Sequence, residues 1–228
     1  MKRLLAIGAL LLAPTGCVSN QGDSLIRFLG ARGINSTAGA CAPEANSQIS
    51  AGLVDISART GYLIAPSVET NIFQQDVSVG QTPVSGSGLN DVTLQELVYS
   101  YELAGTAPAG LTLKEEVVPV YAVFRPQTDP DESYMFLSSL GPLAVEALYK
   151  YYVSDDPGAR PKPETIVLSK IKARGYVSSG GKVESNIFVF PTTVRDYVFK
   201  GCPADSEFIF KCGRLGQDGP ISCEDKGT

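Results

Sequence analysis

Residues 165–190 read TIVLSKIKARGYVSSGGKVESNIFVF, and this stretch decides the fold class. In its first half, apolar or small residues at every second position alternate with Lys170, Lys172 and Arg174. A period of two is typical of a β-strand with one buried face. Residues 178–181 are Ser-Ser-Gly-Gly, which is a turn composition, and the alternation resumes at 183. The stretch therefore predicts an antiparallel β-hairpin.

The hairpin predicts which side chains are buried. Gly180 and Gly181 should adopt the positive φ that the turn needs, while Lys182 should remain in solvent. Four residues share the inward face and should lie in the interior: Ile171, Ala173, Ile187 and Val189.

The same period appears elsewhere after residue 49. We expect one strand over 49–64, a second over 68–79, and further strands over 92–104 and 112–124. Segments rich in Gly, Ser and Pro separate them. This pattern predicts a mainly β fold, an antiparallel two-sheet sandwich that is Ig-like or related.

One short helix is expected near residues 139–152. Ser138 or Ser139 could cap its start, and Pro142 suits its first turn. Its apolar residues recur at helical spacing and should pack on a sheet: Leu143, Ala144, Ala147, Leu148 and Tyr151.

Two segments of the chain are similar to each other. Residues 68–73 read VETNIF and residues 183–188 read VESNIF, and a Gly-Tyr pair precedes each. Similar strands would suit facing or neighbouring positions in a sandwich. Shared structural demands explain the similarity more simply than duplication, because a repeat array needs at least three units.

The first 16 residues predict a signal peptide. A basic start is followed by an apolar run over 4–13 and then by Pro-Thr-Gly-Cys at 14–17. The run is shorter than the roughly 20 residues that a membrane-spanning helix needs. Small residues before Cys17 resemble the lipobox of bacterial lipoproteins, although Pro14 stands where Leu is usual.

The lipobox resemblance implies a membrane anchor. It implies cleavage before Cys17 and acyl chains, such as palmitate, on this residue. Because Val18 and not Asp follows the cysteine, we expect lipid anchoring in the outer membrane, on its periplasmic or cell-surface face. The chain would then divide into a signal peptide (1–16), a lipidated cysteine with a flexible tether (17–48) and a single β-rich domain with a disulfide-clipped tail (49–228).

Composition narrows the possible functions. The formal net charge is −5 and there is no basic block, so nucleic acid is not an expected partner. The chain contains no His, which removes Ser-His-Asp and Cys-His catalysis and the usual imidazole ligands of zinc. We expect no cofactor, no metal and no catalytic residue, and hence a protein that is not an enzyme.

Four cysteines remain besides the lipidated one: Cys41, Cys202, Cys212 and Cys223. An even number in an exported chain predicts disulfides, with three possible connectivities. We favour Cys212–Cys223 with Cys41–Cys202, closely followed by Cys202–Cys212 with Cys41–Cys223. A thiolate metal site is disfavoured because C-x-x-C spacing is missing.

Two short motifs match patterns of phosphate-binding and acyl-transfer sites, but the secondary structure predicted around them does not fit such sites. Ser-Gly-Gly-Lys at 179–182 resembles a phosphate loop, but a strand follows it where a helix is required. Ser169 and Lys172 match the S-x-x-K pattern of acyl-transfer enzymes, yet in a strand they point to opposite faces.

Acidic and aromatic clusters are also read as structural. Asp129, Asp131 and Glu132, or Asp155 and Asp156, could bind Ca²⁺ but lack the spacing of a dedicated site. A binding surface could use several tyrosines, for which half-buried structural roles are preferred: Tyr99, Tyr101, Tyr149, Tyr151 and Tyr152.

The order of these features resembles a group of uncharacterised exported lipoproteins of myxobacterial type. The shared elements are the lipobox, the strand entering Gly-Tyr at 61–62, the late hairpin, and a cysteine-rich tail with Gly-Gln-Asp at 216–218. The resemblance implies no activity. We therefore expect a membrane-anchored lipoprotein with a non-enzymatic structural or protein-interaction role in the cell envelope and an envelope protein as partner. The alternative is a surface lipoprotein that binds a glycan, a metal or a small molecule.

Overall fold

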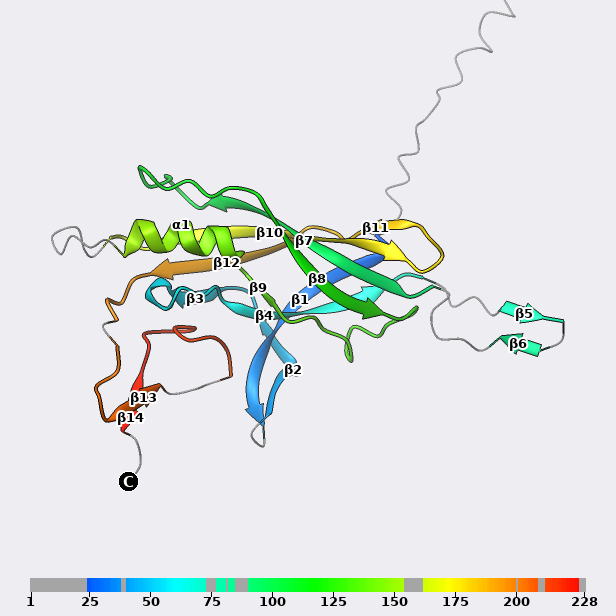
Figure 1. The fold of residues 1–228 in the computed structure, drawn as a ribbon, viewed down its shortest axis with the longest axis horizontal. Coiled ribbons are helices and arrows are strands. Elements are labelled where there is room, and N and C mark those ends of the chain that lie inside the picture. The colour runs from blue at the N-terminus through cyan, green and yellow to red at the C-terminus, as the bar shows by residue number, and fades with distance from the viewer. Residues whose placement is uncertain are drawn as a thin grey trace, which may run out of the picture.

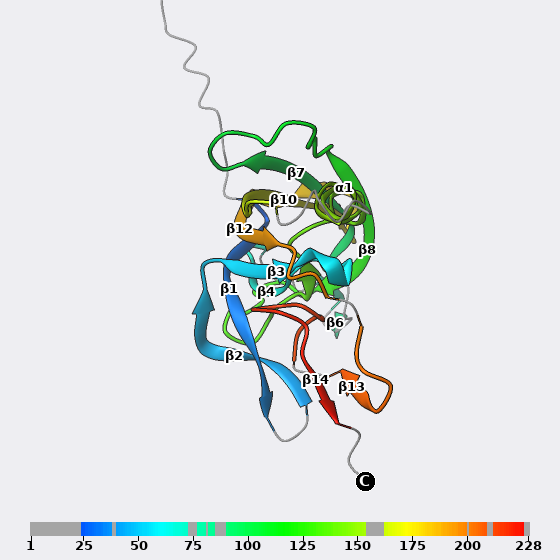
Figure 2. The same cartoon turned by 90° about the vertical axis from the view of Figure 1, so that its left-hand side faces the viewer.

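The computed structural model describes residues 24–37, 40–72, 77–80, 82–84, 90–153, 162–199, 201–208 and 212–225. They form a β-sandwich with one α-helix (Figures 1 and 2). The predicted fold class is thus confirmed.

The larger sheet has the strand order β3 (Gly52–Asp55), β12 (Phe188–Arg195), β10 (Thr165–Val177), β7 (Val92–Leu103) and β8 (Glu116–Phe124). A short strand, β11 (Lys182–Glu184), pairs with the end of β10. All neighbours are antiparallel except β12 and β3, which are parallel.

The smaller sheet has the order β2 (Ala40–Ile49), β1 (Ile26–Thr37), β4 (Leu63–Thr70) and β9 (Leu137–Ser138). Two small hairpins stand outside both sheets, β5 (Val77–Val79) with β6 (Thr82–Val84) and β13 (Ser206–Phe208) with β14 (Cys223–Asp225). Figure 2 shows β1 and β2 extending away from the end of the molecule that carries the helix.

The inner face of the larger sheet is covered by two partners. The smaller sheet covers one part, where Phe28 of β1 meets Phe188 of β12 edge to face, with ring centroids 6.3 Å apart. Helix α1 (Pro142–Tyr152) covers the other part, where Leu148 and Tyr152 pack with Val167 of β10. Both clusters share the inward side of β10, so they form one continuous layer under that strand.

Part of the predicted tether belongs to the sandwich, which corrects the boundary at residue 48. Strand β1 pairs with β2 and β4, and its residues Ile26, Phe28 and Ala31 are buried in the main core. The alternation of Ile26 and Phe28 lies within a Gly- and Ser-rich segment, which concealed it.

The strand expected over 49–64 is interrupted. Strand β3 ends at Asp55, whose side chain accepts hydrogen bonds from the backbone N–H of Ser57 at 3.1 Å and from its hydroxyl at 2.7 Å. This local bonding starts a 3₁₀ turn, η1 (Ile56–Ala58), which ends at Arg59. The chain resumes as β4 only at Leu63.

The predicted hairpin exists, but its second strand changes register. Val183 and Ser185 face inward as expected, whereas Ile187 and Val189 are 57% and 48% exposed. Phe188 and Phe190 are buried in their place. The reason is a one-residue shift at Asn186, whose side-chain amide accepts from the Phe28 N–H at 2.7 Å and donates to the Phe28 carbonyl at 2.9 Å.

The turn of the hairpin behaves nearly as predicted. Gly180 has φ of 102° and Lys182 is exposed. Gly181 does not have positive φ, so one glycine and not two supplies the left-handed conformation.

The two similar segments lie on either side of β1. Thr70 pairs with Ile26 in antiparallel fashion, and Ser185, the equivalent residue of the second segment, forms a parallel bridge with the same Ile26. The two segments therefore flank the same strand, β1, and do not pair with each other in the described part of the chain.

The helix begins at Pro142 and ends at Tyr152, close to the predicted span. Its buried face consists of Ala144, Leu148 and Tyr152, whereas Leu143 is 60% exposed. The stripe is therefore rotated by about one residue from the predicted one. Gly141, and neither of the two serines, occupies the N-cap position.

All four remaining cysteines are oxidised, but both expected connectivities are wrong. The bonds are Cys41–Cys212, here called the long-range disulfide, and Cys202–Cys223, here called the C-terminal disulfide. The second bond closes the tail beside the β13–β14 hairpin, where Phe208 pairs with Cys223. Two disulfides indicate a protein that matures outside the cytoplasm.

Candidate functional site: an apolar cleft beside an open sheet edge

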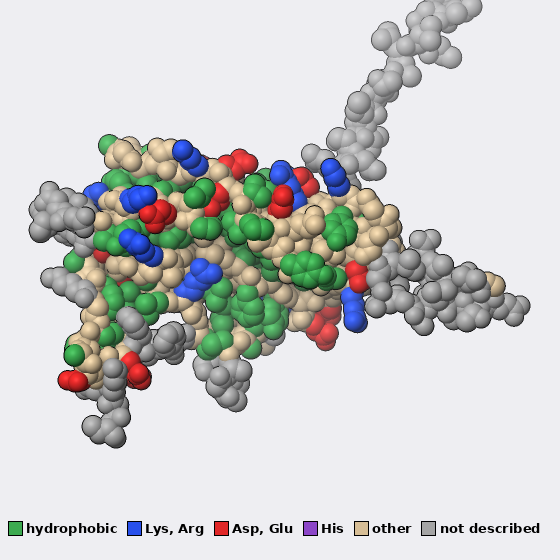
Figure 3. Space-filling view, in the orientation of Figure 1, with side chains coloured by type: hydrophobic (Ala, Val, Ile, Leu, Met, Phe, Trp, Pro, Cys, Tyr) green, Lys and Arg blue, Asp and Glu red, His purple; other side chains and the backbone are tan. Residues whose placement is uncertain are grey.

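Strand β8 forms one edge of the larger sheet. In the described part of the chain its only strand partner is β7. Residues 117–124 carry no charge, and the side chains that point outward are exposed by 51% at Val117, 81% at Tyr121 and 45% at Val123. Figure 3 shows hydrophobic side chains gathered on this face of the molecule, over β8 and β9.

Two features of β8 limit how regularly its open edge can pair with another strand. Pro119 lies near the middle of β8 and has no N–H to offer. The register with β7 also shifts there, because Leu94 pairs with Ala122 and Glu96 with Pro119, which leaves two residues of β8 opposite one of β7. Proline and bulges are the devices by which natural sheets limit unwanted edge pairing. The edge of β8 is thus apolar and open, yet irregular.

A cleft of about 510 Å³ opens between the inner side of β8 and the smaller sheet. Its apolar walls come from β7, β8, β9 with its flanks, and α1: Leu97, Tyr99, Val118, Val120, Phe136, Leu137, Leu140 and Val145. The charged side chains that line the cleft are Arg59, Arg214 and Glu146. A cavity of this size and composition is typical of a small-molecule site.

The hydroxyl groups around the cleft already donate to backbone carbonyls. Tyr99 donates to the carbonyl of Ser138 at 3.0 Å, Ser138 to that of Leu140 at 2.6 Å, and Thr60 to that of Leu215 at 2.9 Å. Burial raises the pKa of Tyr99 well above its ordinary value, and the nearby charge of Glu116 adds to this shift. These hydroxyls therefore organise the cleft and have no proton left to donate to a ligand.

Glu116 lies beside Gly141, a residue of the cleft lining, where helix α1 begins. Its carboxylate accepts from the backbone N–H groups of Leu143 at 2.9 Å and Ala144 at 3.0 Å, and from the Tyr101 hydroxyl at 2.7 Å. A carboxylate from β8 thus caps α1, which compensates for the missing side-chain cap at Gly141. The positive end of the helix is fully used by this contact.

Arg59 reaches the cleft from a strained backbone. Its φ is 52° and its ψ 39°, a left-handed conformation that costs a non-glycine residue about 1–2 kcal/mol. The guanidinium lies over the Tyr149 ring of α1, 3.8 Å from the centroid. The chain accepts this strain at a position that brings a cation to the mouth of the cleft.

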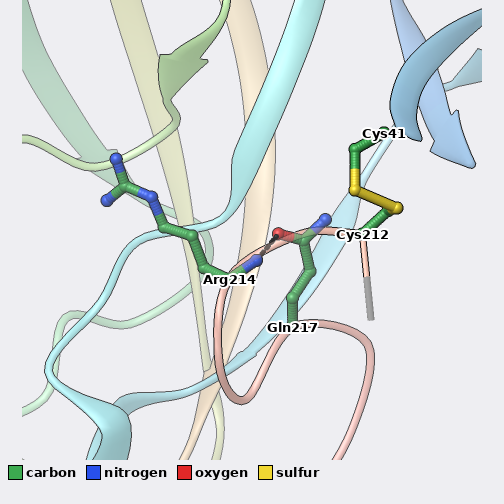
Figure 4. The surroundings of a disulfide bond; sticks show 4 residues. All are labelled: Cys41, Cys212, Arg214 and Gln217. Atoms are coloured by element: carbon green, nitrogen blue, oxygen red, sulfur yellow. Dashed lines mark hydrogen bonds between the residues drawn. A yellow bond between two sulfur atoms is a disulfide. The ribbon is translucent and has the colours of Figure 1, made fainter. Parts of the chain in front are cut away.

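Arg214 enters from the C-terminal tail, on a loop that several contacts hold in place. The long-range disulfide fixes one end of the loop at Cys212. Gln217 then accepts from the Arg214 N–H at 3.1 Å and from the Leu63 N–H at 3.0 Å. Figure 4 shows the Arg214 side chain directed away from the disulfide. Arg214 lines the cleft, and its charge opposes the rise in the pKa of Tyr99.

The sequence-derived candidates lie elsewhere or have structural roles. Residues 179–182 form the hairpin turn, and Ser169 and Lys172 lie on opposite faces of β10, as predicted. Asp131 forms an ion pair at 3.1 Å with the buried Arg32. Asp155 and Asp156 lie outside the described residues.

The tyrosines have mostly structural roles, as preferred. Tyr99 and Tyr152 are almost fully buried. Tyr101 bonds Glu116, and Tyr149 and Tyr151 stack under the cations of Arg59 and Lys162.

Sequence reasoning missed the two arginines that line the cleft and the glutamate that caps the helix beside it. Arg59, Glu116 and Arg214 belong to segments far apart in the sequence, and no spacing rule links them. Among the described residues, no three His, Cys, Asp or Glu side chains come together as metal ligands. No helix within those ranges is long and apolar enough to cross a membrane. The chain matches no family model, no characterised protein and no solved structure.

Proposed function

We propose that this protein is a bacterial lipoprotein, held to the outer membrane by lipid on Cys17, with a non-enzymatic protein-interaction role in the cell envelope. The open apolar edge of β8 is the observation that carries the proposal. An extended segment of another envelope protein adds to this edge as a further strand, and its backbone pairs with β8.

The outward side chains of β8 support this mode of binding. Tyr121 and Val123 are exposed apolar residues in the uncharged segment 117–124 of β8, whereas natural sheet edges that avoid partners usually carry charged residues. A large exposed tyrosine is also a typical anchor of protein interfaces.

The occupant is a foreign segment and not a second copy of this chain. In a symmetric pair, the two β8 strands would bring Pro119 and the adjacent bulge of each copy close together near the middle of the interface. Each copy would then lose hydrogen bonds in the same place. A partner strand of different sequence can place its own irregularity to match.

The location of the protein is proposed from the signal sequence and from the disulfides. The lipobox resemblance at 14–17 supplies the anchor, and the two disulfides fit a compartment outside the cytoplasm. The resemblance to myxobacterial-type lipoproteins fits this location and adds no activity.

Site-specific photocrosslinking tests the interaction in living cells. A p-benzoylphenylalanine in place of Tyr121 should give one dominant crosslinked protein, identified by mass spectrometry. The same group in place of Ile187, which is 57% exposed between β11 and β12, is the matched control and should not give this crosslink.

A second pair of variants links the crosslink to the edge. The double change Tyr121→Lys and Val123→Lys should reduce capture of the partner at least tenfold, while Ile187→Lys with Val189→Lys leaves it unchanged. Equal capture by both double variants would refute the edge as the binding site. A product with twice the mass of this chain would show self-association and would refute the foreign partner.

A further inference from the structure

The cleft behind β8 lies on the opposite side of that strand from its outward face. Val118 and Val120 point into the cleft, whereas Tyr121 and Val123 point outward. With about 510 Å³ between apolar walls, the cleft is large enough for a chain-like apolar molecule.

The polar groups of the cleft determine what that molecule must carry. Its hydroxyl donors are engaged with backbone carbonyls, and Glu116 is engaged with the helix. Glu146 also lines the cleft and is paired at 3.1 Å with Lys150, one helical turn further on. Among the described residues, Arg59 and Arg214 are the lining cations without a carboxylate partner.

We propose that the cleft binds the free carboxylate form of a fatty acid. The carboxylate lies between Arg59 and Arg214, and the hydrocarbon chain lies against Val118, Val120 and Phe136. Guanidinium groups bind carboxylates strongly because their N–H groups match the two oxygens.

A peptide fits this cleft less well than a fatty acid. Each peptide group would need hydrogen-bond partners, and the hydroxyls of the cleft are already committed to the protein backbone. A fatty acid needs polar partners only at its carboxylate. The Thr60 hydroxyl donates to the Leu215 carbonyl at 2.9 Å. The neighbouring residues Arg59 and Arg214 therefore enter the cleft from adjoining backbone. The fatty-acid chain is flexible enough to follow a curved apolar wall.

The test measures binding of dodecanoate to the whole chain carrying Cys17→Ser, in which no acyl chain of its own can compete. Isothermal titration should give saturable binding with one dodecanoate per chain. Dodecanol, which has the same chain without the charge, should bind at least tenfold more weakly. This comparison uses one protein and needs no further substitution.

Variants of the lining residues locate the site. Arg59→Gln and Arg214→Gln should each weaken dodecanoate binding at least tenfold, and Val120→Asp should abolish it. Lys182→Gln removes an exposed cation on the β10–β11 turn and should bind like the parent. A thermal melt of each variant shows whether it is folded.

Three results would overturn the proposal: no saturable binding of dodecanoate, equal binding of dodecanol, or unchanged binding by both folded arginine variants. The crosslinking experiment at Tyr121 tests the outward face of β8, and the dodecanoate experiment tests the cleft. The partner strand and the fatty-acid site can therefore fail independently of each other.

Discussion

Replacing Glu116 tests whether the carboxylate from β8 holds the helix on the sandwich. Glu116 is buried, and its carboxylate accepts hydrogen bonds from Leu143, Ala144 and Tyr101. In Glu116→Ala, two N–H groups at the start of α1 and one hydroxyl lose their acceptor at a buried position. We therefore expect the free energy of unfolding to fall.

The size of this fall depends on the hydrogen bonds that are lost and on the cost of burying the carboxylate, which have opposite signs. Hydrogen bonds to a charged group contribute about 1.5–3 kcal/mol each, so three of them represent roughly 4–9 kcal/mol. The variant also no longer has to bury a carboxylate on folding, and the loss of this desolvation cost offsets several kcal/mol of the total. Measured losses of helix caps, about 1–2 kcal/mol, set a lower limit. We expect a net loss of about 3 kcal/mol, or a fall in Tm of about 6–12 °C for a domain of this size.

Urea denaturation followed by circular dichroism provides the assay. Glu115→Ala, at the exposed neighbouring position, is the control and should change stability by less than about 0.5 kcal/mol. Tyr101→Phe should cost about 1 kcal/mol and should couple with Glu116→Ala in a double-mutant cycle. If Glu116→Ala costs less than about 1 kcal/mol, water replaces the carboxylate and the capping argument fails.

Three further predictions concern the anchor, the disulfides and the hairpin. Cys17→Ser should release the protein from membrane pellets and remove the acyl mass; identical fractionation of both forms would contradict the anchor. Serine replacement of the long-range disulfide should cost about 5 kcal/mol and of the C-terminal disulfide about 3 kcal/mol, because the closed loops span 171 and 21 residues; urea unfolding should give this order. In thermal melts, Phe188→Ala should cost about 3–5 kcal/mol, whereas Ile187→Ala and Lys182→Ala should each stay within about 0.5 kcal/mol; a silent Phe188→Ala would contradict the observed register.

The sequence predicts those elements whose pattern is long and uninterrupted. Strand β10 alternates over its whole length, and β7 and α1 were placed within one or a few residues. These segments form the centre of the larger sheet and the helix beside it. A sandwich with one helix follows from them because an apolar sheet face must be covered.

The errors occur where a single polar side chain changes the backbone. Asp55 turns a continuous alternation into a strand followed by a 3₁₀ turn, and Asn186 shifts the register by one residue. Periodicity assumes that every residue continues the same backbone conformation. Sequence periodicity therefore cannot detect a polar side chain that forms the hydrogen bonds to a backbone that a neighbouring strand would otherwise form.

The disulfides and the cleft lay beyond sequence reasoning for a topological reason. Four cysteines allow three connectivities, and the observed one depends on how the tail returns past β3 to reach Cys41. The same return of the tail brings Arg214 to the cleft, which Arg59 also lines although it lies far earlier in the sequence. A resemblance between short motifs gives no information about such a path.

Two side-chain amides pair with backbone groups that no neighbouring strand pairs, and they provide a comparison for the open edge of β8. Asn186 pairs with the N–H and carbonyl of Phe28, and Gln217 pairs with those of Leu63 at 3.0 and 3.3 Å. A primary amide carries the same donor and acceptor as a peptide group, so each side chain acts as a one-residue strand on the smaller sheet. No such cover lies along residues 117–124 of β8 in the described part of the chain. Side chains pair single backbone groups elsewhere in this protein, whereas within the described residues the outer edge of 117–124 has no partner, and a partner strand would pair with it in the same way.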